Sequence, residues 1–166
     1  MARAKAPTKD ALRAELLGQL EVALAAAQAA HAAAIEGATH EEARPENDKD
    51  TRGLEQSYLA RGQAQRVAEL EAGVAEVTAL ALRVFGAGDP VALSALVDVD
   101  ETVGDADVAH AYFLAPHGGG SVLTGGVQVV TTSSPIGRAL LGRRVDDEVE
   151  LRLPGKLRTL VITAIR

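Results

Sequence analysis

The sequence lacks cysteine altogether and has only four aromatic rings, two of tyrosine and two of phenylalanine. Without cysteine it can form no disulfide, no cysteine-ligated zinc site and no thiol nucleophile. Four rings are too few for the stacking platform on which single-stranded nucleic acid binds. The net charge of −6 argues against a general polyanion-binding protein.

Long apolar runs are missing too. No stretch approaches the ~18 consecutive apolar residues of a membrane span. The basic N-terminus leads into a charged helical segment rather than into the apolar core of a signal peptide. We therefore expect a cytoplasmic protein that does not bind membranes.

What the sequence does contain divides it into two halves. Residues 8–85 are typical of helix, with many alanines and a single proline, Pro45. Residues 87–166 are richer in Gly, Pro, Thr and Val and are typical of strands and turns. The segment Gly86–Pro90 combines residues that end helices and permit turns. We therefore expect two domains, residues 1–86 and 87–166, joined at this segment.

The first half carries two heptad patterns, which predict an antiparallel coiled-coil hairpin of two helices, each roughly 30–38 residues long. The first pattern is Leu17, Leu20, Leu24, Ala27, His31 and Ala34, and the second is Val67, Leu70, Val74 and Val77. The alanines allow the helices to approach closely. Gly37 is the expected end of the first helix. Gly53, Gly62 and Gly73 fall inside the second helix, and the sequence offers no reason for them.

The second half predicts a small α+β module, an antiparallel sheet with one short helix. Its expected strands are Leu93–Val99, Ala109–Leu114, Val127–Thr132, a strand around Val149–Leu153, and Leu157–Ile165, the last two joined by a Pro154–Gly155 turn. The short helix begins with Ser134 as its cap and Pro135 at its first position, and it ends at Gly142.

The expected tip of the hairpin, residues 41–50, is strongly acidic. Five of its ten residues are carboxylates: Glu41, Glu42, Glu46, Asp48 and Asp50. Exposed carboxylates can ligate a hard divalent cation such as Mg²⁺, especially when a partner protein supplies further ligands. The alternative is that these acids only complement the dipole at the start of the second helix. Both interpretations stay open on composition alone.

Several motifs resemble the bacterial transcript-cleavage factors GreA and GreB. The resemblance is most specific in Ser134–Gly142, Val145–Val149 and Pro154–Gly155, and it extends over the hairpin through Glu46–Asn47 and Arg66–Glu71. It implies a coiled-coil hairpin followed by a β module of the FKBP-like type.

The resemblance implies an accessory factor rather than an enzyme, a monomer whose partner is RNA polymerase and which meets nucleic acid only inside the polymerase complex. Its β module would dock at the rim of the secondary channel through Ser134, Pro135, Ile136, Arg138 and Leu141. Its tip would act at the polymerase active site through Glu46, Glu42, Asp48 and Asn47. No tightly bound cofactor is implied, only an Mg²⁺ shared with the polymerase and held weakly by Glu46 and Glu42.

The tip departs from the family pattern, which leaves alternatives open. Ala43 stands where the family has its first aspartate, and Asp50 where it has a tyrosine. Cleavage stimulation and channel-blocking inhibition, as in related proteins with extra tip acids, both fit. A prolyl isomerase or chaperone needs an aromatic-lined pocket, but Tyr112 and Phe113 are sequence neighbours that point to opposite faces of a strand. A non-catalytic coiled-coil adaptor is the third class.

Overall fold

The computed structural model describes residues 7–39 and 52–166. They form two compact units. The sheet unit comprises the described residues up to Leu17 together with Glu76–Arg166, and the hairpin unit comprises the described residues between Gly18 and Ala75. The sheet unit thus takes in the base of both long helices as well as residues 87–166. The boundary expected at Gly86–Pro90 stays a prediction.

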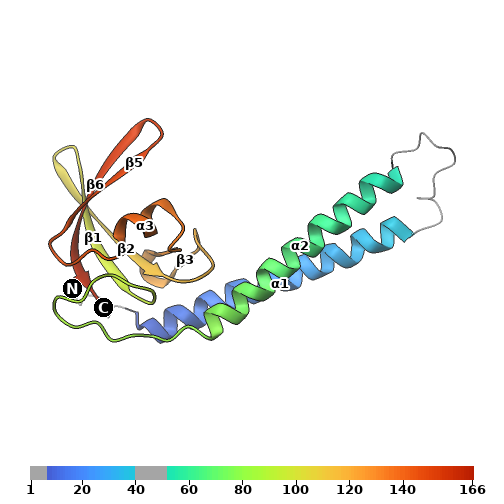
Figure 1. Ribbon diagram of the computed structural model, residues 1–166, viewed down its shortest axis with the longest axis horizontal. Coiled ribbons are helices and arrows are strands. Elements are labelled where there is room, and N and C mark those ends of the chain that lie inside the picture. Colours follow the sequence, from blue (N-terminus) through green and yellow to red (C-terminus); the bar gives the residue numbers. More distant parts are fainter. Residues whose placement is uncertain (1–6, 40–51) are drawn as a thin grey trace. The chain divides into compact units, whose positions relative to one another are not determined.

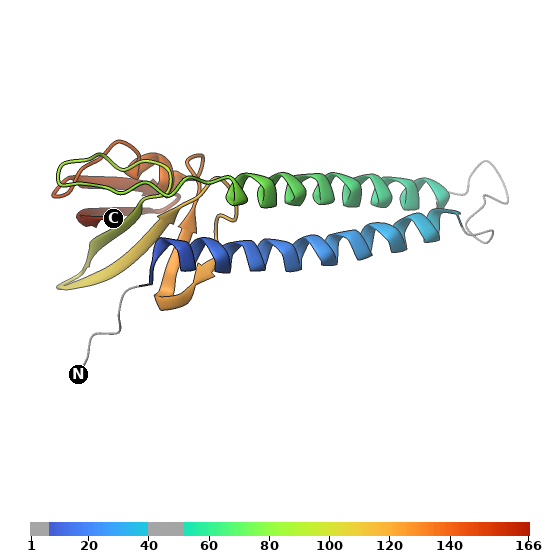
Figure 2. The same ribbon diagram turned by 90° about the horizontal axis from the view of Figure 1, so that it is seen from below.

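The two long helices are α1 (Lys9–Thr39) and α2 (Arg52–Thr78), which lie side by side in both views (Figures 1 and 2). The predicted heptad is confirmed on α1, where Leu20, Ala27 and Ala34 are buried at intervals of seven residues. On α2 the buried positions are Leu70, Gly73 and Val77. Burial at Gly73 gives that glycine a packing role. No packing reason appears for Gly62, where an added Cβ would meet open space.

The first helix does not end at Gly37 as predicted. It continues to Thr39, whose hydroxyl donates to the Ile35 carbonyl at 3.0 Å. A Cβ on Gly37 would lie 3.1 Å from Oε1 of Gln56 on α2. Gly37 therefore serves close approach between the helices rather than termination.

The second helix ends at Thr78, seven residues before the expected limit, because tertiary hydrogen bonds replace helical ones. The Leu80 carbonyl accepts from Nη1 of Arg13 at 3.0 Å. The Arg83 N–H donates to the Ser94 hydroxyl at 2.9 Å, and the Arg83 carbonyl accepts from Lys9 Nζ. A helix prediction from local sequence cannot take account of hydrogen-bond partners that are this distant in the chain.

The sheet has the order β3-β4-β2-β1-β6-β5, and every pair in it is antiparallel except β2 with β4 (Figure 1). Its strands are β1 (Leu96–Val103), β2 (Ala106–Leu114), β3 (Val122–Leu123), β4 (Val127–Val130), β5 (Glu148–Leu153) and β6 (Lys156–Ile165). A 3-10 turn, η2 (Thr124–Gly126), precedes β4, and the short helix α3 (Pro135–Leu140) follows it. The predicted fold class, a helical hairpin followed by a sheet with one short helix, is confirmed.

The strand predictions placed both strands of the β1–β2 hairpin but stopped short of its turn. β1 begins three residues after Leu93 and runs on to Val103, where it turns through Gly104–Asp105 into β2. Gly104 supplies the turn with a positive φ of 63°. The alternation signal failed there because a charged residue, Glu101, faces the buried side of β1.

Both faces of the sheet carry buried side chains. On the face covered by α3 the core includes Val97, Tyr112, Leu114, Leu140, Leu160 and Ile162. Phe113, the neighbour of Tyr112, is fully buried as well, and the alternation of β2 places it on the other face. Leu12 and Leu16 of α1 are also fully buried, and Leu16 lies against Gly118. Neither leucine belongs to the predicted heptad. Both are part of the sheet unit and not of the hairpin unit.

Candidate functional site

The acidic tip cannot be described from this structure. Glu41, Glu42, Ala43, Glu46, Asn47, Asp48 and Asp50 all lie outside the described residues, and their roles stay predictions. Among residues 7–39 and 52–166, no group of three or more Asp, Glu or His side chains could hold a metal ion. None of the helices in the same ranges has the length and apolar character of a membrane span.

The other candidate site surrounds α3. The start of this helix is capped by Ser134, as the sequence predicted. Ser134 caps the helix by accepting from the Gly137 N–H at 3.0 Å, and its own hydroxyl donates to the Thr131 carbonyl at 2.8 Å. Pro135 takes the first helical position, where its missing N–H costs nothing. The serine hydroxyl therefore ties the helix start to the end of β4.

Gly137 is the residue that the sequence reasoning missed. It is buried, and a Cβ there would overlap the Thr131 carbonyl oxygen, which also accepts the Ser134 N–H at 3.0 Å. Only glycine permits this approach of helix to strand end. A glycine in the first turn of a short helix was the available signal.

The five predicted docking residues divide into two groups. Pro135, Arg138 and Leu141 are exposed, Leu141 by 45%. Ser134 and Ile136 are half-buried, and Ile136 packs against the core of the sheet unit. The exposed three are available to a partner, whereas the other two hold α3 in place.

An apolar hollow of about 250 Å³ lies beside the start of α3. Its lining combines α3 with β4, the glycine loop before β3 and the end of β5: Gly119, Gly120, Gln128, Val129, Val130, Ser134, Pro135, Ile136 and Leu153. No charged or aromatic side chain lines it. The sequence reasoning did not foresee this hollow, since its walls come from four segments that are distant in the chain.

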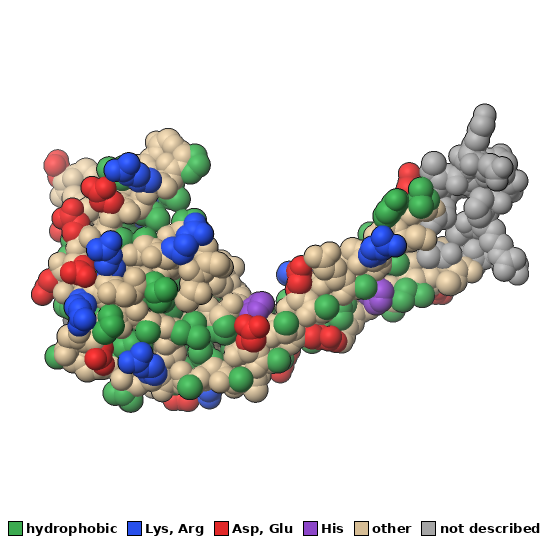
Figure 3. Space-filling model, viewed as in Figure 1, with side chains coloured by type: hydrophobic (Ala, Val, Ile, Leu, Met, Phe, Trp, Pro, Cys, Tyr) green, Lys and Arg blue, Asp and Glu red, His purple; other side chains and the backbone are tan. Residues whose placement is uncertain are grey.

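The loop after α3 is anchored to the segment before β1. Gly142, with a φ of 80°, donates its N–H to the Val91 carbonyl at 2.8 Å, and the Val91 N–H donates to the Arg143 carbonyl at 2.7 Å. The Arg144 guanidinium donates to the Gly88 carbonyl. Arg138 and Arg143 stay exposed. Basic and acidic side chains alternate over the visible face of the sheet unit (Figure 3).

A buried ion pair closes the far end of the core. Both Glu101 carboxylate oxygens accept from Arg158, at 2.7 Å from Nε and 2.6 Å from Nη2. His110 Nε2 lies 3.0 Å from Oε2 of the same carboxylate. The hydrogen bonds from Arg158 lower the pKa of Glu101 from 4.5 to about 2, against the opposing effect of burial. The same pairing raises the pKa of Arg158.

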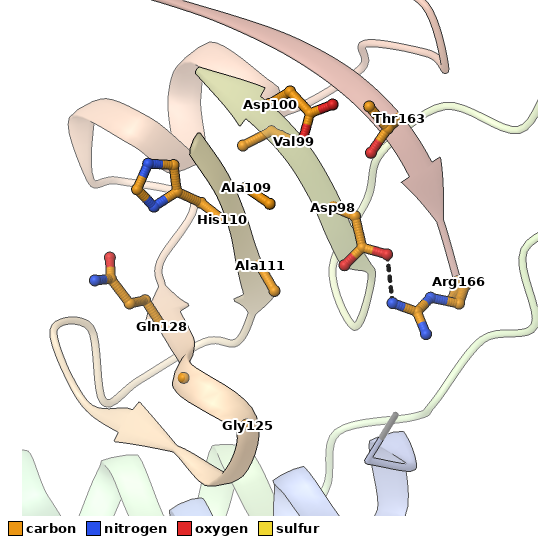
Figure 4. A pocket seen from close by; sticks show the side chains of 11 residues that line it. Asp98, Val99, Asp100, Ala109, His110, Ala111, Gly125, Gln128, Thr163 and Arg166 are labelled. Atoms are coloured by element: carbon orange, nitrogen blue, oxygen red, sulfur yellow. Dashed lines mark hydrogen bonds and ion pairs between the residues drawn. The ribbon is translucent and has the colours of Figure 1, made fainter. Parts of the chain in front are cut away.

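A larger and more polar hollow, of about 660 Å³, opens on the other face of the sheet (Figure 4). Asp98 and Asp100 of β1 line it, together with Thr163 of β6 and Arg166. Arg166 is ion-paired with Asp98. Ala109 and Ala111 of β2 leave the space empty because their side chains are short.

Comparisons with known proteins agree with the motifs around α3. Residues 121–166 match the family model described as transcription elongation factor GreA/GreB, C-terminal. No curated protein matches the chain. The sequence resemblance to this family is thereby confirmed over the segment that contains β3, α3 and the β5–β6 hairpin.

Solved structures with a similar fold include the GreA factor homolog 1 (Gfh1) of Thermus thermophilus, at 21% identity and a TM-score of 0.40, covering 90% of this chain and 94% of that one. Thermus aquaticus Gfh1 has 24% identity and a TM-score of 0.41, covering 91% of each chain. A GreA/GreB factor from Nitrosomonas europaea has 23% identity and a TM-score of 0.36, covering 60% and 78%. The family relationship rests on the family model alone, which matches residues 121–166 of the present chain to the C-terminal module of the GreA/GreB transcription elongation factors.

Proposed function

We propose that this protein is a Gre-like accessory factor that binds bacterial RNA polymerase at its secondary channel and modulates backtracked elongation complexes. The single observation that carries the proposal is the family match of residues 121–166. The fold is consistent with it, since a long hairpin accompanies the matched module. The chemical step would belong to the polymerase, and this chain would act through the polymerase active site.

The polymerase-docking surface in this proposal is the exposed side of α3. Pro135, Arg138 and Leu141 offer two apolar contacts and one positive charge, next to an apolar hollow. Of these three residue types, arginine is the one that often dominates binding energy at interfaces. The Ser134 cap and the Gly137 contact hold the helix rigidly, which limits the entropy lost on binding.

The active end in this proposal is the acidic tip. Glu46 is its principal carboxylate, with Glu42, Asp48 and Asn47 as helpers, because Glu46–Asn47 is the pair that matches the family motif. Carboxylate oxygens suit Mg²⁺. Glu46 and Glu42 would hold a shared ion only weakly, so polymerase carboxylates would supply most of its ligands. A second ion at such a site stabilises the attacking and leaving oxygens of a phosphodiester.

Ala43 leaves two forms of this function open, stimulation of RNA cleavage and obstruction of the channel. An alanine cannot ligate metal, so the tip has one carboxylate fewer than a cleavage factor at that position. Cleavage stimulation and obstruction of the channel are therefore the two outcomes to be distinguished. RNA cleavage by a stalled, backtracked elongation complex, with and without the protein, distinguishes them directly.

Two variants sharpen that assay. Glu46→Ala is expected to bind polymerase as the unmodified protein does and to lose the effect on backtracked complexes. Ala43→Asp is expected to raise cleavage stimulation. Full activity of Glu46→Ala, or no effect of Ala43→Asp together with loss in Glu42→Ala, would assign the tip function to other residues.

The prolyl isomerase alternative finds no support in the hollow beside α3. The apolar hollow beside α3 has no aromatic lining, and Tyr112 and Phe113 are both fully buried. An isomerase pocket needs accessible aromatic side chains. A polymerase pull-down with the full chain separates the proposal from the remaining alternative, a coiled-coil adaptor.

A further inference from the structure

A third hollow on the sheet unit, of about 320 Å³, lies where the first turn of α1 meets the segment after α2. Leu82, Val84 and Phe85 are its apolar lining residues, and Val84 is 92% exposed. Phe85 is half-buried and packs against the main core, which fixes the position of its ring. This hollow shares no lining residue with the one beside α3.

Two cations converge on the Phe85 ring. Lys9 Nζ lies 4.7 Å from the ring centroid, and Cζ of Arg83 lies 5.0 Å from it. Lys9 Nζ also donates to the Arg83 backbone carbonyl, which ties the Lys9 side chain to the segment after α2. Arg166 lines the hollow as a third cation. The ring face attracts cations but neutralises no charge.

The carboxylates nearby are engaged elsewhere. Asp10 lines the hollow, but its side chain is 82% exposed and pairs with Arg13 at 3.6 Å. Asp98 pairs with Arg166. Within the described part of the chain, neither Lys9 nor Arg83 has an ion-pair partner. Burial and the neighbouring Arg83 charge lower the pKa of Lys9, and the charge of Asp10 opposes this shift without cancelling it.

We propose that this hollow binds a phosphate group carried by a small ligand, either free pyrophosphate or a nucleotide. A phosphate between Lys9 and Arg83 would relieve their mutual repulsion. The planar guanidinium matches two phosphate oxygens, and the ammonium adds a compact positive charge. The hollow has the size of a small-ligand site. This site is independent of the polymerase-docking surface proposed above.

Calorimetric titration of the full-length protein with inorganic pyrophosphate tests the proposal, with amide and ring NMR shifts to locate the site. We expect saturable 1:1 binding and the largest shifts at Lys9, Arg83 and Phe85. A nucleoside diphosphate titrated in parallel identifies the source. Tighter binding than pyrophosphate, with added shifts at Leu82 and Val84, indicates a nucleotide, and equal binding indicates free pyrophosphate.

Arg83→Met and Lys9→Met keep the apolar part of each side chain and remove the charge. Each is expected to weaken pyrophosphate binding on the order of tenfold, the loss of one charge-assisted contact. The matched control is Arg152→Met, whose side chain is 85% exposed on β5 and which should bind within about twofold of the unmodified protein.

Three results would overturn the proposal. The first is no saturable binding to the unmodified protein, which needs no variant to interpret. The second is shifts that spread over all exposed arginines instead of clustering at Phe85. The third is an equal loss in Arg152→Met and Arg83→Met, which would indicate attraction by overall charge.

Discussion

The sheet unit and the hairpin unit are stabilised by different amounts of buried apolar surface. The sheet unit buries large side chains completely, among them Tyr112, Phe113 and Leu160. In the described part of the hairpin unit the buried side chains are Leu20, Ala27, Ala34 and Leu70. Hydrophobic stabilisation scales with buried apolar area, about 25 cal/mol per Å². An alanine seam therefore gives the hairpin unit less hydrophobic stabilisation than the sheet unit has.

The largest expected effect comes from the buried ion pair of the sheet unit. Glu101→Gln leaves the half-buried Arg158, whose side chain is 15% exposed, without its counter-charge and should lower the free energy of unfolding by about 3–5 kcal/mol, measured by denaturant titration. Glu150→Gln removes a carboxylate from an exposed pair with Arg152. That control should stay within about 0.5 kcal/mol. Equal effects of the two variants would contradict the claim that the stability of the sheet unit depends on its buried carboxylate.

The next largest effect is a loss of stability that we expect for substitutions at the base of α1 but not for exposed positions farther along the helix. Leu16→Ala removes a fully buried side chain from the sheet unit and should cost about 2–4 kcal/mol in the same titration. Val22, which is 73% exposed on the same helix, is the control, and Val22→Ala should change stability by less than about 0.5 kcal/mol. A small effect of Leu16→Ala would mean that α1 contributes little to the sheet unit.

Acid should weaken the sheet unit through Glu101. Its pKa is about 2 in the folded protein, below the ordinary 4.5, so its contribution is fully present above about pH 4.5 and is lost as the pH falls toward 2. The midpoint of thermal unfolding, measured from pH 5 to pH 2, should fall more steeply for the unmodified protein than for Glu101→Gln. Parallel slopes would contradict the lowered pKa.

The smallest effect tests the hairpin unit alone. Gly62 is exposed within α2, and a Cβ there meets open space, so Gly62→Ala should stabilise the helix by about 0.5–1 kcal/mol. Hydrogen exchange should slow at the amides of α2 and stay unchanged in the sheet. Slower exchange in both units would show that they open together and would contradict a difference in stability between them.

Local signals predicted most of this fold. The heptad spacing of Leu20, Ala27 and Ala34 indicated the hairpin, and the Ser134–Pro135 cap indicated α3. The failures share a physical cause. The early end of α2 depends on hydrogen bonds from Arg13 and Lys9, some seventy residues away in the chain.

The candidate site around α3 was also predicted only in part. Pro135, Arg138 and Leu141 were identified by motif and are exposed, whereas Gly137 and the hollow beside α3 were not identified. Their importance arises from a strand end and from loops that only the folded chain brings to α3. The tip residues, Glu46 foremost, lie outside the described residues and remain predictions from the sequence.

The central claim is that the sheet unit supplies the affinity for RNA polymerase, while the acidic tip supplies the effect on backtracked elongation complexes. Its most direct test is the affinity of full-length variants for core RNA polymerase. Leu141→Asp places a charge on the exposed side of α3, and Leu157→Asp places the same charge on a 57% exposed residue of β6. We predict at least about tenfold weaker binding for Leu141→Asp, a loss of roughly 1.4 kcal/mol, with unchanged affinity for Leu157→Asp and Glu46→Ala. Unchanged affinity of Leu141→Asp together with lost affinity of Glu46→Ala would contradict the account.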